Sequence, residues 1–217
     1  MCAADTSDEA RCLIECRFRE CLTEDVTAPA GILSHQRMAR RGIVQLPTGV
    51  VLTNLSMHPD ERGVFTEVFR KQWETGADPV QWNVVSSGKG VLRGVHVHPK
   101  HDDYLLILSG RATVGLRDLR RGSDTYGLAA KADLSGDELR AITIPHGVAH
   151  GFLFHEPSIH LYAVSRYWDT ADELACFWGD AGLAIEWPFE PSLVSEGDAA
   201  APSLAELLTK IEPHQPF

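Results

Sequence analysis

Two histidine-bearing stretches dominate the sequence, residues 90–98, which read GVLRGVHVH, and residues 145–151, which read PHGVAHG. In the first stretch, His96 and His98 alternate within an apolar run, so on a β-strand both side chains face the same side. In the second stretch, His150 ends a turn that contains proline and glycine and leads into another apolar run. If these strands belong to a barrel and the shared face is its interior, the histidines point into a cavity.

The rest of the chain from about Gly42 has the pattern of a β-protein. Short apolar runs separated by Gly, Asp, Ser and Pro predict several short strands, which is typical of a sandwich or barrel. Ser203, with Glu206 three residues later, predicts a capped C-terminal helix. We expect His155 and His160, which flank a turn, to lie on the surface. The predicted strands are Val50–Leu55, Val64–Phe69, Val80–Val85, Val91–Val97, Tyr104–Leu108, Ala112–Leu119, Leu139–Ile144, Gly151–Phe154 and Ile159–Tyr167.

Residues 1–40 differ in character from the rest and are expected to form an N-terminal extension. Thr6 and Glu9 predict a capping box and a helix to about Leu22, followed by a linker. Four of the five cysteines fall in the first 21 residues, and three have the spacing C-x3-C-x4-C, which fits none of the common zinc or iron–sulfur patterns. A docking helix with small apolar residues therefore competes with a metal site. Beyond it we expect a barrel domain over residues 41–190 and a tail with a helix over residues 191–217.

Composition restricts the partners and the compartment. Asp and Glu number 30 against 20 Lys and Arg, a formal charge of −10, and an acidic surface argues against binding nucleic acid. No run of 18 apolar residues is present to span a membrane, and the first residues lack the basic and apolar segments of a signal peptide. With an odd number of cysteines, these features predict a reduced, cytoplasmic setting.

The histidine stretches resemble the two motifs of the cupin superfamily, which are double-stranded β-helix (jelly-roll) barrels. The matching spacing is Gly90-x5-His96-x-His98-x4-Asp103-x6-Gly110, then Pro145-x-Gly147-x2-His150. From about Leu55 to Leu204 the chain is similar to the dTDP-4-dehydrorhamnose 3,5-epimerase family within that superfamily. The matching segments follow in order as residues 60–67, 81–83, 89–96, 118–120, 122–127, 144–152, 161–162, 185–188 and 195–198.

The resemblance implies an enzyme that inverts carbons 3 and 5 of a nucleotide-linked 4-keto-6-deoxy sugar without a cofactor. A proton beside a ketone can be removed by a positioned base if the resulting enolate is stabilised. By resemblance, His96 is the base, Asp198 orients it, and Tyr162 is the proton donor. The family is typically homodimeric, and a strand of one subunit helps to form the other subunit's site.

Further residues occupy substrate-binding positions of the family. Two of them are arginines, which suit a diphosphate because guanidinium binds it in a bidentate fork. A tryptophan stands where the family usually has a tyrosine stacked on the base. The full set is Arg62, Glu67, Gln81, Asn83, Arg93, His150, Trp168 and Glu173.

Two departures from the family pattern concern the enolate. Asp103 stands where the family has a lysine, and Gly197 stands where it has a second basic residue. A carboxylate opposes an enolate and donates no hydrogen bond unless its pKa is strongly raised. Epimerisation at a single carbon, and an inactive homologue that binds nucleotide sugars, are therefore alternatives.

A metal-dependent cupin enzyme, an isomerase or an oxygenase, is the other alternative. His98 replaces a glutamine of the family and, with Asp103, restores a pattern by which other cupins bind iron, manganese, nickel or zinc. A metal-bound His96 could not also act as the base, because one nitrogen cannot do both jobs. The ligands on this interpretation are His96, His98, Asp103 and His150, with His101 and Asp102 as substitutes if the loop register shifts.

Overall fold

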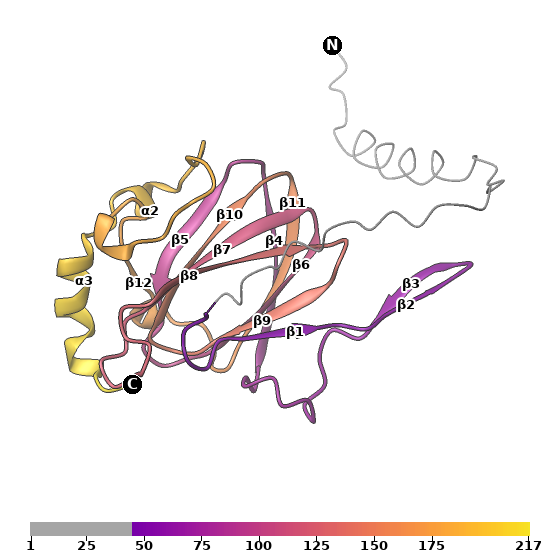
Figure 1. The fold of residues 1–217 in the computed structure, drawn as a ribbon, viewed down its shortest axis with the longest axis horizontal. Helices are drawn as coiled ribbons and strands as arrows, with labels where there is room; N and C mark the ends of the chain where they lie inside the picture. The colour runs from indigo at the N-terminus through magenta and orange to yellow at the C-terminus, as the bar shows by residue number, and fades with distance from the viewer. Residues whose placement is uncertain (1–44) are drawn as a thin grey trace, which may run out of the picture. The chain divides into compact units, whose positions relative to one another are not determined.

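Two five-stranded antiparallel sheets form the framework of residues 45–217, the part of the chain that the computed structural model describes (Figure 1). In order, the first sheet contains β1 (Val51–Asn54), β9 (Arg140–Ile144), β6 (Asp103–Ser109), β11 (Ser158–Val164) and β4 (Gln81–Ser87). The second contains β12 (Leu174–Ala175), β5 (Leu92–Val97), β10 (Val148–Phe154), β7 (Arg111–Asp118) and β8 (Ala129–Ser135). The predicted β-class and jelly-roll fold are confirmed. The N-terminal cysteine helix predicted from the sequence lies outside the described residues.

Alternating side chains fill the space between the sheets. Leu105 and Ile107 of β6, Val114 and Leu116 of β7, and Phe154 of β10 are buried in one apolar cluster. Because side chains alternate along a strand, the same alternation carries polar residues into the interior near one end of the barrel. That end holds the functional side chains described below.

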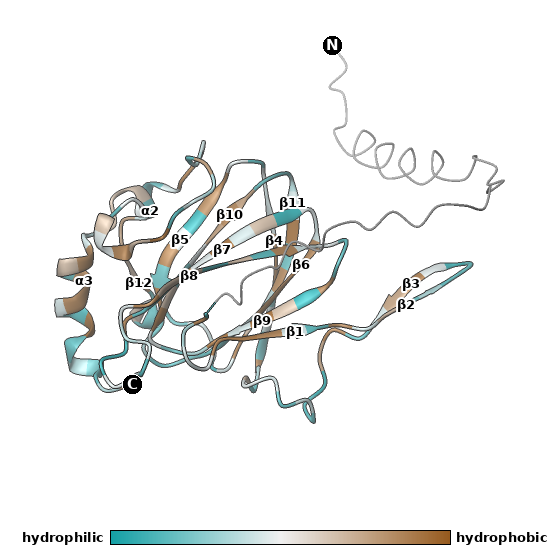
Figure 2. Cartoon of the chain, viewed as in Figure 1, coloured by the Kyte–Doolittle hydropathy of each residue, from teal (hydrophilic) through white to brown (hydrophobic). Residues whose placement is uncertain are grey.

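The outer face of the second sheet is covered by the C-terminal segment. Helix α3 (Leu204–Ile211) begins at the predicted capping box of Ser203 and Glu206, and Figure 2 shows both apolar and hydrophilic positions along it. Leu204, Leu207 and Ile211 pack on Val95 and Val97 of β5. The remaining short helices are α2 (Glu196–Ala199), η1 (Thr170–Asp172), η2 (Ala181–Leu183) and η3 (Glu212–His214). Within residues 45–217, no helix combines the length and the apolar character needed to cross a bilayer.

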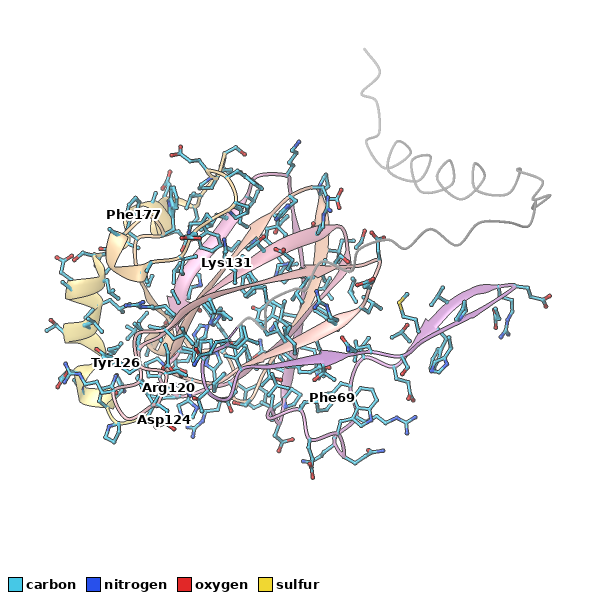
Figure 3. All side chains as sticks on the ribbon, in the orientation of Figure 1. Phe69, Arg120, Asp124, Tyr126, Lys131 and Phe177 are labelled. Atoms are coloured by element: carbon cyan, nitrogen blue, oxygen red, sulfur yellow. The ribbon has the colours of Figure 1, made fainter. Side chains whose placement is uncertain are left out.

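A separate hairpin, β2 (Met57–Asp60) with β3 (Gly63–Thr66), projects from the barrel (Figure 1). Its side chains are mostly exposed, including Val64 and Phe65 at 57% and 65%. Where the chain returns to the barrel, Phe69, labelled in Figure 3, packs edge-on against Trp82 and Tyr104 at 5.5 and 5.4 Å between ring centroids. The hairpin thus leaves an apolar surface free of contacts with the described barrel.

All nine predicted strand segments contain a strand, but three strands were not predicted. β2 contains a proline, β12 has only two residues, and β8 has the sequence AAKADLS, which lacks β-branched and aromatic residues. β8 nevertheless alternates, because Ala130, Ala132 and Leu134 are buried. Pairing with β7 therefore outweighs the weak intrinsic preference of this segment.

Candidate active site

A cavity of about 700 Å³ opens between the sheets, within the size range of small-molecule sites. Strands of both sheets and the segment before α2 line it. The polar lining side chains are Ser86, Ser87, Arg93, His96, His98, His101, Asp103, His150, His160, Tyr162, Trp168, Glu173, Ser195 and Asp198. This set contains all three residues predicted to be catalytic.

The pairing of β5 with β10 places two of the histidines side by side. His96 is the pairing partner of His150, and the register shifts between His150 and Gly151. A shift of this kind bends a strand and changes the direction of its side chains. Gly94 makes the close approach possible, because it has φ +96° and an added Cβ would lie 2.8 Å from the His150 carbonyl oxygen.

His96 and Asp198 form a hydrogen-bonded pair. The two come from β5 and α2, and His96 Nε2 lies 2.7 Å from Asp198 Oδ1. Since a carboxylate only accepts, this hydrogen bond places a proton on Nε2, and Nδ1, which has no hydrogen-bond partner among the described residues, is the nitrogen left to receive another proton. Glu173 Oε1 lies 3.1 Å from that Nδ1. The histidine therefore has one orienting carboxylate and one carboxylate beside its reactive nitrogen.

The Asp198 carboxylate is held as an anion by its surroundings. Burial alone would raise its pKa, but hydrogen bonds from His96 and from the Gly94 amide (3.3 Å) outweigh burial and lower the pKa below the ordinary value. Ser195 caps α2 by accepting from the Asp198 amide at 3.0 Å, which fixes the backbone that carries the carboxylate.

Tyr162 enters the cavity from β11, in the sheet opposite His96. Its pKa is raised, chiefly by burial and further by Glu173 and Asp103, so the phenol keeps its proton at neutral pH. The described chain therefore brings a histidine and a protonated tyrosine to one cavity from opposite sheets.

The surface position expected for His160 is wrong. His160 is 3% exposed, lines the cavity, and stacks on Phe154 at 5.3 Å between ring centroids. Burial, with a smaller effect of Arg93, lowers its pKa to about 4. His160 lies two residues before Tyr162 on the same strand, so the period of two along the strand is the sequence signal for its position on the cavity face.

Besides His150, three of the predicted substrate-binding residues line the cavity, namely Arg93, Trp168 and Glu173. Arg93 donates from Nε to Ser87 Oγ at 2.9 Å, and Trp168 donates from its indole nitrogen to Glu173. Gln81 accepts from the Trp168 amide at 3.1 Å, although Gln81 itself does not line the cavity. The exposed indole, 49% accessible, leaves a flat face open for stacking.

Other predicted substrate-binding residues lie away from this cavity. Arg62 is on the β2–β3 hairpin and pairs with Asp60 at 2.6 Å, and Glu67 pairs with Arg70. Asn83 accepts from Gln81 at 3.0 Å on the same face of β4 as lining residues, but neither amide reaches the cavity lining. Within residues 45–217, the cavity of a single chain thus contains one of the two predicted arginines.

A second buried cluster occupies the same cavity. His98 Nε2 and His150 Nε2 each lie 3.7 Å from Asp103 Oδ2, and His101 Nε2 lies 4.0 Å from Asp103 Oδ1. Burial lowers the pKa of His98 to about 2 and of His150 to about 4, and it raises that of Asp103 well above its ordinary value. These residues could hold a metal ion, and they include His101 in place of His96, whose two nitrogens face other carboxylates.

Asp172 supports this cluster and was not predicted from the sequence. Asp172 ends η1, is 5% exposed, and has Oδ2 2.7 Å from His101 Nδ1. Neither a motif nor a periodicity connects it with His101, 71 residues away. Only the folded position of the η1 turn brings the two side chains together.

Comparison with known proteins gives consistent matches along the barrel. A protein from Pseudomonas aeruginosa named dTDP-4-dehydrorhamnose 3,5-epimerase is 34% identical over 169 residues, covering 72% of this chain and 92% of that protein. A protein of the same name from Neisseria gonorrhoeae is 34% identical over 168 residues, and this match covers 72% of this chain and 50% of that protein.

Solved structures agree in fold. An epimerase from Legionella pneumophila in complex with dTDP-4-keto-L-rhamnose has a TM-score of 0.68 and 32% identity, covering 73% of this chain and 92% of that one. ChmJ, a 3'-monoepimerase from Streptomyces bikiniensis in complex with dTDP-quinovose, has a TM-score of 0.68 and 27% identity, covering 79% of this chain and 89% of that one. The family model described as dTDP-4-dehydrorhamnose 3,5-epimerase matches residues 45–206. The chain therefore belongs to the dTDP-4-dehydrorhamnose 3,5-epimerase family.

Proposed function

We propose that this protein epimerises a dTDP-linked 4-keto-6-deoxyhexose by removing and returning a proton on a carbon next to the keto group. The observation that carries the proposal is the His96–Asp198 pair facing the same cavity as Tyr162, which comes from the opposite sheet. Inversion of a carbon needs a base on one face of the sugar and an acid on the other.

The residues divide the reaction between them. His96 Nδ1 takes the proton, the C–H electron pair forms a double bond to the keto carbon, and the carbonyl π pair moves to the keto oxygen, which gives the enolate. Asp198 keeps the imidazole in the tautomer with Nδ1 free and stabilises the imidazolium that forms. Tyr162 then gives its proton to the opposite face of the same carbon, and solvent resets both groups. No electrons leave the substrate, so these steps require no redox cofactor.

Two of the lining residues support the recognition of a nucleotide diphosphate. Arg93 supplies a guanidinium for the diphosphate, and the open face of Trp168 suits stacking on the base. The complexes of the Legionella and Streptomyces relatives with dTDP sugars are consistent with this choice.

A second copy of the chain would complete the site. Arg62 lies on the exposed β2–β3 hairpin next to Val64 and Phe65, which are 57% and 65% exposed. Exposed apolar side chains on a projecting hairpin suit an interface between subunits. In the homodimer we propose, the hairpin of one subunit brings Arg62 to the other subunit's cavity, where Arg93 is the arginine already present.

Complementation between variants tests the dimer. Arg62→Ala and His96→Asn should each be nearly inactive alone. After mixing and refolding together, one site of each heterodimer has both residues, so about a quarter of the wild-type activity should return. No recovery in a mixture that forms heterodimers would contradict the shared site.

Activity is tested with purified protein and dTDP-4-keto-6-deoxy-D-glucose, following the sugar by NMR. The wild type should form a sugar inverted at carbon 3, carbon 5 or both, and His96→Asn should not. Inversion at one carbon only would agree with the presence of Asp103 at the position where the family has a lysine. Binding of the nucleotide sugar without any turnover would contradict the proposal and identify an inactive homologue. The cytoplasmic setting stays a prediction.

A further inference from the structure

The cluster of His98, His101, Asp103 and His150 has no role in the proton transfers assigned to His96 and Tyr162. All four side chains line the cavity, and each is at least nine-tenths buried, between 2% and 6% exposed. Burying three imidazoles and a carboxyl group is costly unless a partner satisfies them. The cluster therefore calls for a ligand of its own.

The atoms that face one another in this cluster are not hydrogen-bonded. The separations from Asp103 to the Nε2 atoms, 3.7, 3.7 and 4.0 Å, exceed hydrogen-bond length. Within residues 45–217 neither oxygen of this buried carboxyl group has a hydrogen-bond partner. Two ligands of one tetrahedral ion at bond lengths of 2.0–2.1 Å lie roughly 3.4 Å apart. The observed spacing is thus close to that between ligands that share an ion.

The opposite nitrogen of each histidine is already anchored. Nδ1 of His150 lies 3.1 Å from the Val148 carbonyl oxygen, and Nδ1 of His98 lies 3.3 Å from the Asp172 carbonyl oxygen. Nδ1 of His101 lies 2.7 Å from Asp172 Oδ2. These contacts place the protons on Nδ1 and leave each Nε2 lone pair directed at Asp103. Histidines that bind metals are typically oriented in this way.

We propose that His98, His101, Asp103 and His150 bind one divalent transition-metal ion. The ligand atoms of the first three lie within 4.8 Å of one another, and His150 Nε2 is the fourth. Three imidazole nitrogens and one carboxylate oxygen suit zinc, iron, nickel or manganese. Four protein ligands leave positions open on an octahedral ion.

The ion would supply positive charge where the reaction develops negative charge. In the described chain no lysine lines the cavity, and Arg93 is at the rim with Ser86 and Ser87. An ion beside His150, the strand neighbour of His96, would lie next to the base and could polarise the keto oxygen as a Lewis acid. This catalytic role rests on the proposed function, whereas the binding of the ion does not.

Metal binding is tested on the full chain without a histidine tag. Protein stripped with EDTA is dialysed against Zn²⁺ or Mn²⁺ alone, and the bound metal is measured by elemental mass spectrometry. We expect about one ion per chain and a higher melting temperature for the loaded protein. Less than about a tenth of an ion per chain with both metals would overturn the proposal.

Conservative variants locate the ion. Asp103→Asn and His101→Gln should each lower the affinity at least tenfold while circular dichroism shows a folded barrel. His146→Gln is the matched control, because His146 pairs with Asp102 at 2.7 Å outside the cavity lining, and this variant should bind metal as the wild type does. Undiminished binding by Asp103→Asn and His101→Gln would place the ion elsewhere and overturn the assignment.

Activity assays separate this proposal from the proposed function. If the ion stabilises the enolate, the metal-loaded protein should epimerise at least tenfold faster than the stripped protein. Equal rates would overturn the catalytic role and leave the binding site intact. Metal binding without turnover in either form would contradict the proposed function instead, and oxygen consumption by the iron-loaded protein would then identify an oxygenase.

Discussion

Replacing Asp198 with asparagine tests the proposed division of work between His96 and its neighbours. The change keeps the shape of the side chain but removes its charge. The His96 Nε2 to Asp198 Oδ1 distance of 2.7 Å lies in the range of a charge-assisted hydrogen bond, and the carboxylate is only 11% exposed. The substitution therefore removes the anion that orients the imidazole and stabilises its protonated form.

The size of the effect follows from that hydrogen bond. A hydrogen bond to a charged group contributes about 1.5–3 kcal/mol, which corresponds to about a 10- to 150-fold lower kcat. KM should change by less than about threefold, because Asp198 acts through His96 and the loss appears in the transition state. Stability should change little, since Ser195 accepts from the backbone amide of the substituted residue and still caps α2.

The assay is the initial rate of hydrogen exchange between the substrate and deuterated water, measured by NMR with the wild type and Asp198→Asn. Asp133→Asn is the matched control, since Asp133 also accepts a hydrogen bond, from Thr113 Oγ1 at 2.6 Å, outside the cavity lining. It should exchange at the wild-type rate. An exchange rate within twofold of the wild type in a folded Asp198→Asn protein would refute the reasoning.

Three further outcomes follow from the structure. Tyr162→Phe should continue to exchange the substrate proton but lose inversion at least about 100-fold, as measured by product NMR, because the base remains and the acid is gone. Gly94→Ala should lower the free energy of unfolding by roughly 1–3 kcal/mol in urea titrations, since φ is +96° and the new Cβ would lie 2.8 Å from the His150 carbonyl oxygen. Asp118→Ala should lower the free energy of unfolding by about 3 kcal/mol at pH 7, because it removes the buried carboxylate that pairs with Arg120 at 2.8 Å. Burial raises the pKa of Asp118, but hydrogen bonds, chiefly from Arg120, hold it below the ordinary 3.8, so this stabilisation is present above that value and is lost as the pH falls through the folded pKa. The difference in urea midpoint between wild type and Asp118→Ala should therefore shrink in acid, and a constant difference would contradict this account.

The sequence predicted the barrel well because its strands contain short apolar runs bounded by turn residues. The run in β6 is continuous because both faces of this strand are buried, Leu105 and Ile107 in one apolar cluster and Tyr104 and Leu106 in another. β8 has no such run, and its only signal in the sequence is the alternation of Ala130, Ala132 and Leu134, which are buried.

Strands determine the direction of side chains, and this accounts for the position of two residues predicted as catalytic. His96 and Tyr162 lie on β5 and β11, and both reach the lining. The surface position predicted for His160 was wrong, although alternation along β11 places it on the same face as Tyr162. His101 and Asp172 could not be placed, because a loop and a short 3₁₀ turn carry them and only tertiary packing determines their contact. Arg62 lies on a projecting hairpin, where a single chain does not determine its neighbours.

Deuterium incorporation at carbons 3 and 5 is the measurement that tests the central claim most directly. The wild type, incubated in deuterated water with dTDP-4-keto-6-deoxy-D-glucose, should introduce deuterium at one or both carbons, and His96→Asn should introduce none. Folded, metal-loaded protein that binds the nucleotide sugar yet leaves both carbons unlabelled would contradict the account.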